Sequence, residues 1–296
     1  MTVNTENIVV SFIQHLQADG KGPKTILSYS GDVRAFLQWL EDKGQSFHGH
    51  FSRFHITRYL NQLQELNYTP NTINKKVNSL HCFNHFLINQ KLMQEKVVFP
   101  NKDKIKIARG SEAEVAVFSK PELERLLFYI EDQAQVSQRD KVVVLLLLYT
   151  GLRVSELVNI RLKDLDLLAL NLKVVGKGGK YREIPLKSEV AEAVQIYLEG
   201  DRKAHKHATS PYLLLTQRAG RMDKDTVNKL LRKIGSRIDL DIHPHKFRHT
   251  FCSRLVQLNV PLTTVSKLAG HASIQTTAHF YINTSRQDKE QAVSLL

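Results

Sequence analysis

Cysteine is scarce in this sequence, with two among 296 residues. Cys82 and Cys252 are too few for a disulfide framework and lack zinc-site spacing, so we expect both to be small buried residues. Long hydrophobic runs are also missing. The longest, Val142 to Leu148, is far too short to cross a bilayer, and the first residues lack the apolar segment of a signal peptide. These absences predict a soluble, intracellular protein without a membrane partner.

Acidic residues are also few relative to basic ones. Asp and Glu number 29 against 42 Lys and Arg, a net charge of +13, which indicates a polyanionic partner such as nucleic acid. The imbalance is uneven, because residues 1–99 hold 10 basic and 7 acidic residues and residues 100–296 hold 32 and 22. There is no glycine-rich nucleotide loop and no acidic metal cluster, so we predict neither a cofactor nor a metal ion.

The first hundred residues show the periodicity of four helices. Apolar residues recur about every 3.6 positions in four stripes, which run over residues 8–16, 26–40, 56–66 and 73–87. Thr69-Pro70 starts the fourth, as a capping residue followed by a first-turn proline. The pattern predicts a small bundle over residues 1–95.

Residues 96–117 break this period and predict an interdomain linker, mobile or laid along DNA. Its basic side chains are candidates for DNA binding, although solvated surface charges would have the same pattern; they are Lys102, Lys104, Lys106 and Arg109. A second domain then begins at Ser119-Lys120-Pro121-Glu122, which forms a capping box.

The second half predicts helices around one small hairpin. Val142 to Leu148 is expected to be a helix buried on most sides, and residues 170–175 and 181–186 are expected to be strands joined by a glycine-rich tip. Further helices are predicted at residues 188–199, 223–236, 245–258 and 262–269. The fold class is therefore mainly α with a small β-hairpin or sheet.

Six residues of this half make chemical sense together at a phosphodiester: Arg153, Lys177, His245, Arg248, His271 and Tyr281. Arginine forks match the non-bridging oxygens of a phosphate. A tyrosine is a slow nucleophile unless a base takes its proton and fixed positive charge stabilises the transition state. Each residue taken alone has a plainer interpretation: a surface arginine, a helix-terminal histidine or a core tyrosine.

Three histidines allow a different interpretation. His245 and His249 lie four residues apart on one helix face, and His243 adds a third nitrogen ligand for zinc. No Cys or carboxylate group accompanies them, and nearby arginines would repel a cation. We therefore do not predict a metal site.

In combination, these segments resemble the signature boxes of the tyrosine recombinases of phage integrase and Xer type. The resemblance rests on Thr150-Gly151-Leu152-Arg153, Gly176-Lys177-Gly178, His245-Lys246-Phe247-Arg248 and Ala269-Gly270-His271, with Tyr281 ten residues later. It covers roughly residues 115–285. By pattern alone, the first hundred residues resemble the SAM-like helical domain with which that family clamps core DNA.

The resemblance implies a role for each site residue. Tyr281 would be the nucleophile and Phe280 holds the position nine residues after His271, so the longer, phage-integrase-like spacing applies. Arg153, Arg248 and His271 would stabilise the phosphate, and His245 would help to move the tyrosine proton.

Lys177 would protonate the leaving 5′-oxygen, and its Gly-Lys-Gly context favours it over Lys180, which we assign to a backbone phosphate. Glu156, three residues after Arg153, would support the active site without contacting the phosphate, for example by holding the Arg153 guanidinium. The resemblance makes both Arg248 and His245 catalytic, whereas His249 would be structural or hydrogen-bonded to the backbone.

The family also implies an activity and an assembly. We expect a site-specific recombinase that works through a 3′-phosphotyrosyl intermediate, as a homotetramer on double-stranded DNA with short inverted-repeat core sites, in the bacterial cytoplasm at the nucleoid. The lack of a large extra N-terminal domain favours resolution of chromosome dimers or transposon cointegrates. The catalytic domain would span residues 118–285, and residues 286–296 would form a tail exchanged between subunits, or a disordered end.

Two alternatives remain open at this point. A topoisomerase of type IB would use the same chemistry, but the short chain and small N-terminal domain disfavour it. A catalytically silent DNA-binding relative is disfavoured because no residue of the boxes is missing.

Overall fold

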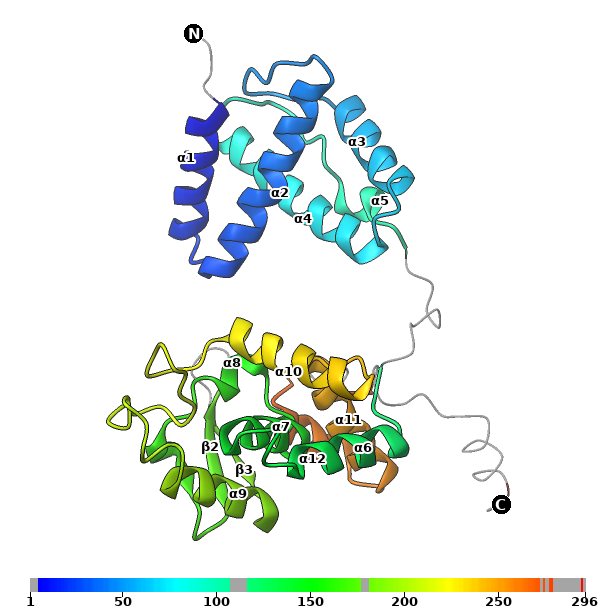
Figure 1. Cartoon of the computed structure of the whole chain (residues 1–296). Helices are drawn as coiled ribbons and strands as arrows, with labels where there is room; N and C mark the ends of the chain where they lie inside the picture. The colour runs from blue at the N-terminus through cyan, green and yellow to red at the C-terminus, as the bar shows by residue number, and fades with distance from the viewer. Residues whose placement is uncertain are drawn as a thin grey trace. The chain divides into compact units, whose positions relative to one another are not determined.

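The computed structural model of the protein divides the chain into two compact units, Met1–Glu112 and Ala113–Leu296, each with its own hydrophobic core (Figure 1). Residues 5–106, 116–176 and 181–271 are described, together with residues 274, 277, 278 and 294. The predicted class is confirmed: the structure is mostly helical, with a small antiparallel sheet. None of the helices in the described ranges is both long and apolar enough to cross a bilayer.

The first unit contains the four predicted helices packed around aromatic rings. The helices are α1 (Thr5–Ala18), α2 (Pro23–Asp42), α3 (Arg53–Glu65) and α4 (Pro70–Asn89). The predicted cap at the start of α4 is present, since Thr69 Oγ1 accepts a hydrogen bond from the backbone N–H of Thr72. Phe12 and Phe83 are fully buried and meet edge to face, with ring centroids 5.2 Å apart, a favoured geometry for aromatic pairs.

Residues 97–105 pack onto this unit, whereas the sequence predicted a linker from residue 96 onward. The Asp103 carboxylate accepts hydrogen bonds from both guanidinium nitrogens of Arg53, one of them at 2.7 Å. The side chain of Asn74 bonds both backbone groups of Ile105, at 2.8 and 3.0 Å. Asp103 is the last residue of the short helix α5 (Pro100–Asp103). Because the partners lie 31 and 50 residues away in sequence, the local charge pattern did not reveal them.

In the second unit, α7 (Gln138–Thr150) runs through the core (Figure 1). Every residue from Val142 to Leu148 is buried, as the sequence predicted, with α9 and α11 packed against the helix. The helices around it are α6 (Lys120–Glu131), α8 (Val154–Leu157), α9 (Ser188–Glu199), α10 (Lys224–Ile238), α11 (Pro244–Gln257) and α12 (Leu262–Ala269). The capping box predicted for α6 is present, because Ser119 and Glu122 bond each other's backbone N–H groups.

The predicted strands form an antiparallel pair, β2 (Asn171–Val175) and β3 (Tyr181–Pro185), after the short 3₁₀ helix η1 (Leu162–Asp164). A third strand that the sequence did not predict, β1 (Leu165–Asp166), pairs with β2 on its other edge. Side chains alternate along β3: Ile184 is buried, Arg182 is partly buried, and Glu183 between them is exposed. This alternation directs Arg182 toward α12, which packs on β3.

The ion pair between Arg53 and Asp103 provides a test of the first unit's boundary. Asp103→Ala should lower the free energy of unfolding of the first unit by about 2 kcal/mol, because the Arg53 guanidinium loses its carboxylate partner and the backbone N–H of Phe99 loses its acceptor. Trp39, the chain's single tryptophan, lies in this unit, so its fluorescence in urea reports on it. The matched control is Lys102→Ala, which removes an exposed neighbour and should change little. Equal stability of both variants would mean that residues 97–105 are not part of the cooperative fold.

Candidate active site

Arg153 stands at the start of α8 because α7 ends abruptly at Gly151. That glycine has φ +60°, and any Cβ there would overlap the ring of Phe251, so both the conformation and the space require glycine. Two residues later Arg153 becomes the N-cap of α8. Its Nη2 donates to the carbonyl oxygen of Gly270 at 2.8 Å, and its side chain is 36% exposed. The guanidinium is therefore held in place with one edge open to solvent.

Glu156 is the buried carboxylate at the centre of this arrangement. One oxygen accepts from Arg153 Nη1 at 3.0 Å and the other from the backbone N–H of Arg153 at 2.9 Å. Arg182 of β3 donates to both oxygens, at 2.9 and 2.8 Å. Burial alone would raise the pKa of Glu156, but the hydrogen bonds from Arg182 and Arg153 hold this pKa below its ordinary value. The carboxylate is therefore charged and shared between two arginines, while its supporting role in catalysis stays a prediction.

Arg248 of α11 is buried and points its guanidinium toward the same place. Its Nη1 donates to the Gly151 carbonyl oxygen at 2.7 Å, while the buried Nη2 has no hydrogen-bond partner among the described residues. Burial, followed by repulsion from Arg153, lowers the pKa of Arg248 to about 10, so the group remains charged at neutral pH. A buried donor without an acceptor is costly, and an anion placed there would remove the cost.

His271 follows directly on Gly270, which ends α12 in the left-handed conformation. Its Nδ1 lies 2.8 Å from the hydroxyl of Thr277. When that hydroxyl donates to Nδ1, the ring carries its proton on Nε2 and can donate it to an oxygen. Burial, followed by the charges of Arg248 and Arg153, lowers the pKa of His271 to about 4, so the ring is neutral at pH 7.

His245 is exposed on the first turn of α11, with its ring centroid 6.3 Å from that of His249. Although the side chain is exposed, partial desolvation of its ring, followed by the charges of His243 and Arg248, lowers the pKa of His245, so it too is a neutral base at pH 7. His243 instead caps α11, because its Nδ1 accepts from the backbone N–H of Lys246 at 3.2 Å. Within the described ranges no three His, Cys, Asp or Glu side chains are arranged to hold a metal ion.

The predicted site residues thus fall into three groups. Arg153, Glu156, Arg248 and His271 meet through hydrogen bonds or mutual charge effects, and His245 lies within the electrostatic reach of both arginines. Lys177, Lys180, Arg109 and Tyr281 lie outside the described residues. Lys102, Lys104 and Lys106 are exposed on the first unit, and their DNA contacts remain predictions.

Arg182 is the site residue that the sequence analysis missed. A signal was present, since a charged residue on the same face of a strand as buried Ile184 needs a buried partner. The partner's identity could not be read, because Glu156 is 26 residues away.

A basic face on α10 was also missed. Its exposed members recur at intervals of three or four residues, the spacing of one helix face, and α10 packs against α8; they are Lys229, Arg232, Lys233 and Arg237.

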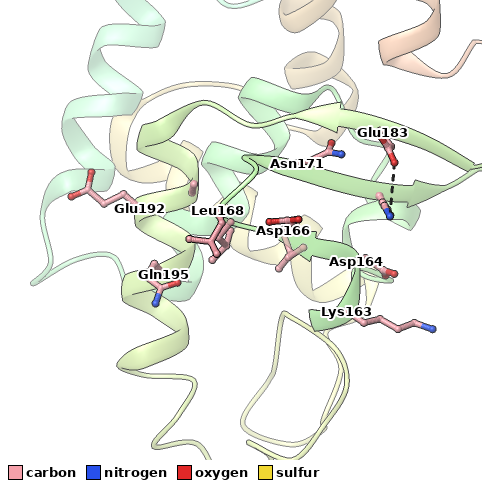
Figure 2. A pocket seen from close by; sticks show the side chains of 12 residues that line it. Lys163, Asp164, Asp166, Leu168, Asn171, Glu183, Glu192 and Gln195 are labelled. Carbon is pink, nitrogen blue, oxygen red and sulfur yellow. Dashed lines mark ion pairs between the residues drawn. The ribbon is translucent and has the colours of Figure 1, made fainter.

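Glu183, on the opposite face of β3 from Arg182, lines a pocket together with residues of β1, β2 and α9 (Figure 2). There it lies 3.9 Å from Lys173, and the other acidic side chains lining the pocket are Asp164, Asp166 and Glu192. These carboxylates would repel a polyanion. Two neighbouring residues of β3 therefore lie in environments of opposite charge. Arg182 lies in the cationic site and Glu183 lines an acidic pocket.

Comparison with protein families gives two matches. The model of the phage integrase family matches residues 116–288, which include every predicted catalytic residue. The model of the phage integrase N-terminal SAM-like domain matches residues 9–91, a range that runs from within α1 to just after α4.

Individual proteins are similar over nearly the whole chain. The TnP I resolvase of Bacillus thuringiensis is 28% identical over 293 residues, covering 98% of this chain and all of the resolvase. Tyrosine recombinase XerC of Bacillus pumilus is 32% identical over 286 residues, covering 93% of this chain and 91% of XerC. The crystal structure of the XerH site-specific recombinase bound to a palindromic difH substrate aligns with a TM-score of 0.77 at 19% identity, covering 99% of this chain and 90% of XerH.

The lowered histidine pKa values predict how the second unit responds to acid. The pKa of His249, like that of His271, falls to about 4, mainly through burial, so both bind protons more readily in the unfolded chain, where the ordinary value is 6.5. Stability should therefore fall as pH drops from about 6.5 to about 4, the window between the two values. Thermal unfolding followed by circular dichroism, with Trp39 fluorescence as the separate signal of the first unit, measures this loss.

Replacing both histidines, as His249→Gln with His271→Gln, should reduce the loss of stability between pH 6.5 and pH 4.5. The control is His15→Gln on α1, which should leave the loss unchanged. A double variant as acid-sensitive as the natural chain would show that these histidines are not the groups responsible.

Proposed function

The chain belongs to the phage integrase family of tyrosine recombinases, and on that premise we propose that it exchanges DNA strands through a covalent 3′-phosphotyrosyl intermediate. It is a site-specific DNA recombinase. The intermediate, the assembly and the role of each residue are the parts we propose, and the charge and geometry of the described site support them.

The observation that carries the proposal is the unpaired Nη2 of Arg248 beside Arg153 and His271. Three arginines and one carboxylate give the site a net charge of +2, with His245 and His271 neutral. A phosphodiester carries one negative charge, and attack by a tyrosine oxyanion raises it to two in the transition state. Fixed positive charge of this size stabilises the transition state more than the ground state.

The proposed reaction moves one phosphoryl link without hydrolysis. Tyr281 Oη attacks the scissile phosphorus as His245 accepts its proton, and the bond to the 5′-oxygen breaks. Lys177 gives a proton to that oxygen, so the cleaved strand ends in a 5′-hydroxyl. Arg153, Arg248 and His271 hold the non-bridging oxygens throughout. The link between DNA and Tyr281 retains the energy of the broken bond, so rejoining requires no nucleotide triphosphate.

Binding to the duplex would draw on both units. In the second, the exposed basic face of α10 is suited to phosphate contacts, and its helix packs against the one that begins at Arg153. In the first, Lys102 and Lys104 are exposed at α5, which is anchored to the bundle. We propose that the two units clamp the duplex and that Lys180 and Arg109 add phosphate contacts.

Exchange between two duplexes needs four nucleophiles, so we propose a homotetramer on short inverted-repeat core sites, at the bacterial nucleoid. The proposed division is a core-binding domain at residues 1–95, a linker running on from the anchored residues 97–105, a catalytic domain at residues 118–285 and a tail at residues 286–296 for contact between subunits. Similarity to the TnP I resolvase favours cointegrate or dimer resolution as the biological setting.

The nucleophile is tested by a covalent adduct. A duplex selected from a random-sequence library for binding, then nicked near its cleavage point, should trap the natural chain on DNA. Tyr281→Phe should bind this duplex with the same affinity and form no adduct, because it loses only the attacking oxygen. Excess chelator should not slow the reaction, since positive side chains supply the charge. An adduct with Tyr281→Phe, or a strict need for a divalent ion, contradicts the mechanism.

The general acid is tested by changing the leaving group. Lys177→Ala should slow cleavage at least roughly 100-fold, the lower end of the usual range for general acid catalysis. A substrate with sulfur in place of the bridging 5′-oxygen should restore the rate, because a thiolate leaves without a proton. The matched variant Lys180→Ala should show no such rescue. If Lys180→Ala alone is rescued, the acid is Lys180.

A further inference from the structure

Arg182 makes more hydrogen bonds inside the site than a simple ion pair requires. Both terminal nitrogens donate to Glu156, and Nε donates to the carbonyl oxygen of Leu268 at 3.0 Å. Its side chain is only 13% exposed. A Cβ on Gly270 would lie 2.7 Å from Arg182 Nη1, so the chain turn before His271 packs directly on the guanidinium.

These contacts decide which arginine neutralises the negative charge of Glu156. Arg182 binds both carboxylate oxygens in the two-pronged geometry that is strongest for this pair, whereas the Arg153 side chain binds one of them. Without Arg182, Arg153 would be the nearest cation to a buried carboxylate and would be largely neutralised by it. Its attraction for a phosphate would then fall, since opposite charges in a poorly solvated site interact strongly.

We propose that Arg182 is a positioning residue for strand cleavage, which compensates the charge of Glu156 so that Arg153 keeps its positive charge for the scissile phosphate. This inference rests on the proposed function. Arg182 acts through Glu156 and Arg153 and does not itself contact DNA. Its bond to Leu268 also ties β3, which follows Lys177 in the sequence, to the end of α12, which precedes His271.

A purely structural role makes a different prediction, which permits a test by charge. If Arg182 only held β3 against α12, removing Glu156 as well would damage the site further. If Arg182 compensates charge, removing the carboxylate relieves the harm done by removing the arginine. The comparison therefore needs four chains: the natural one, Arg182→Gln, Glu156→Gln and the double variant.

The readout is the rate of adduct formation on the nicked duplex, measured together with affinity for the same duplex. Arg182→Gln should slow adduct formation roughly 100-fold, as loss of a stabilising charge in an active site does, and change affinity by less than about threefold. Adding Glu156→Gln should restore at least about tenfold of the lost rate. A double variant no faster than Arg182→Gln overturns the proposal, as does a loss of affinity that accounts for the whole loss of rate.

Two further variants separate charge from folding. Arg182→Lys keeps the positive charge and should remain at least about tenfold faster than Arg182→Gln, even if the glutamine variant folds poorly; a lysine variant as slow as glutamine overturns the proposal. The matched control is Arg202→Gln, which removes another buried arginine of this unit. Arg202 donates to the backbone carbonyls of Ala208, Ser210, Tyr212 and Leu213. The Arg202→Gln variant should be less stable, but its rate of adduct formation should change less than about threefold. A 100-fold loss of rate in this variant would point to general unfolding.

The natural chain separates this inference from the function on which it rests. If it forms no adduct, the proposed function fails and the role of Arg182 falls with it. If the natural chain forms the adduct but the double variant is no faster than Arg182→Gln, only the proposed role of Arg182 is wrong.

Discussion

One buried carboxylate, Glu156, holds the second unit's site together, because two arginines from distant parts of the chain share it. Arg153 reaches it from the start of its own helix and Arg182 from β3. Both arginines also donate to backbone carbonyls around the end of α12, those of Gly270 and Leu268. The helix start, the strand and the turn before His271 are thus connected through a single charged group. A buried charge of this kind is tolerable only when it is fully hydrogen-bonded, which makes the geometry strict.

The same site keeps a surplus of positive charge out of water. Arg248 is buried with one unpaired nitrogen, and burial together with Arg153 lowers its pKa. Such an arrangement costs folding free energy, which the large apolar core around α7 offsets. In the proposed function the benefit is preorganisation: Arg248 Nη2 already lacks a partner among the described residues, so little rearrangement would be needed when a phosphate binds. Neutral histidines add donors and acceptors there without adding further repulsion.

The two units differ in their cores and in where they carry exposed positive charge. The first is a bundle with an aromatic core, extended by residues 97–105, whose anchoring bonds bring exposed lysines close to the folded surface. The second builds a precise site on rigid elements and carries its basic face on a separate helix, α10. Acidic side chains gather instead in the pocket beside α9, where they do not offset the charge of the site. Segregating the charges in this way lets a basic protein hold carboxylates without weakening its attraction for DNA.

Much of the architecture followed from local pattern, because helix periodicity, caps such as Ser119 and Thr69, and strand alternation are decided by neighbours in sequence. The order of the boxes, through the family resemblance, also predicted the roles that we propose for Arg153, Arg248 and His271. Only the tertiary structure decided which charges are paired. It paired Arg182 with Glu156, paired Asp103 with Arg53 and left Arg248 with an unpaired nitrogen among the described residues. Such pairings join residues tens of positions apart, and their energies depend on burial and distance, which exist only once the chain has folded.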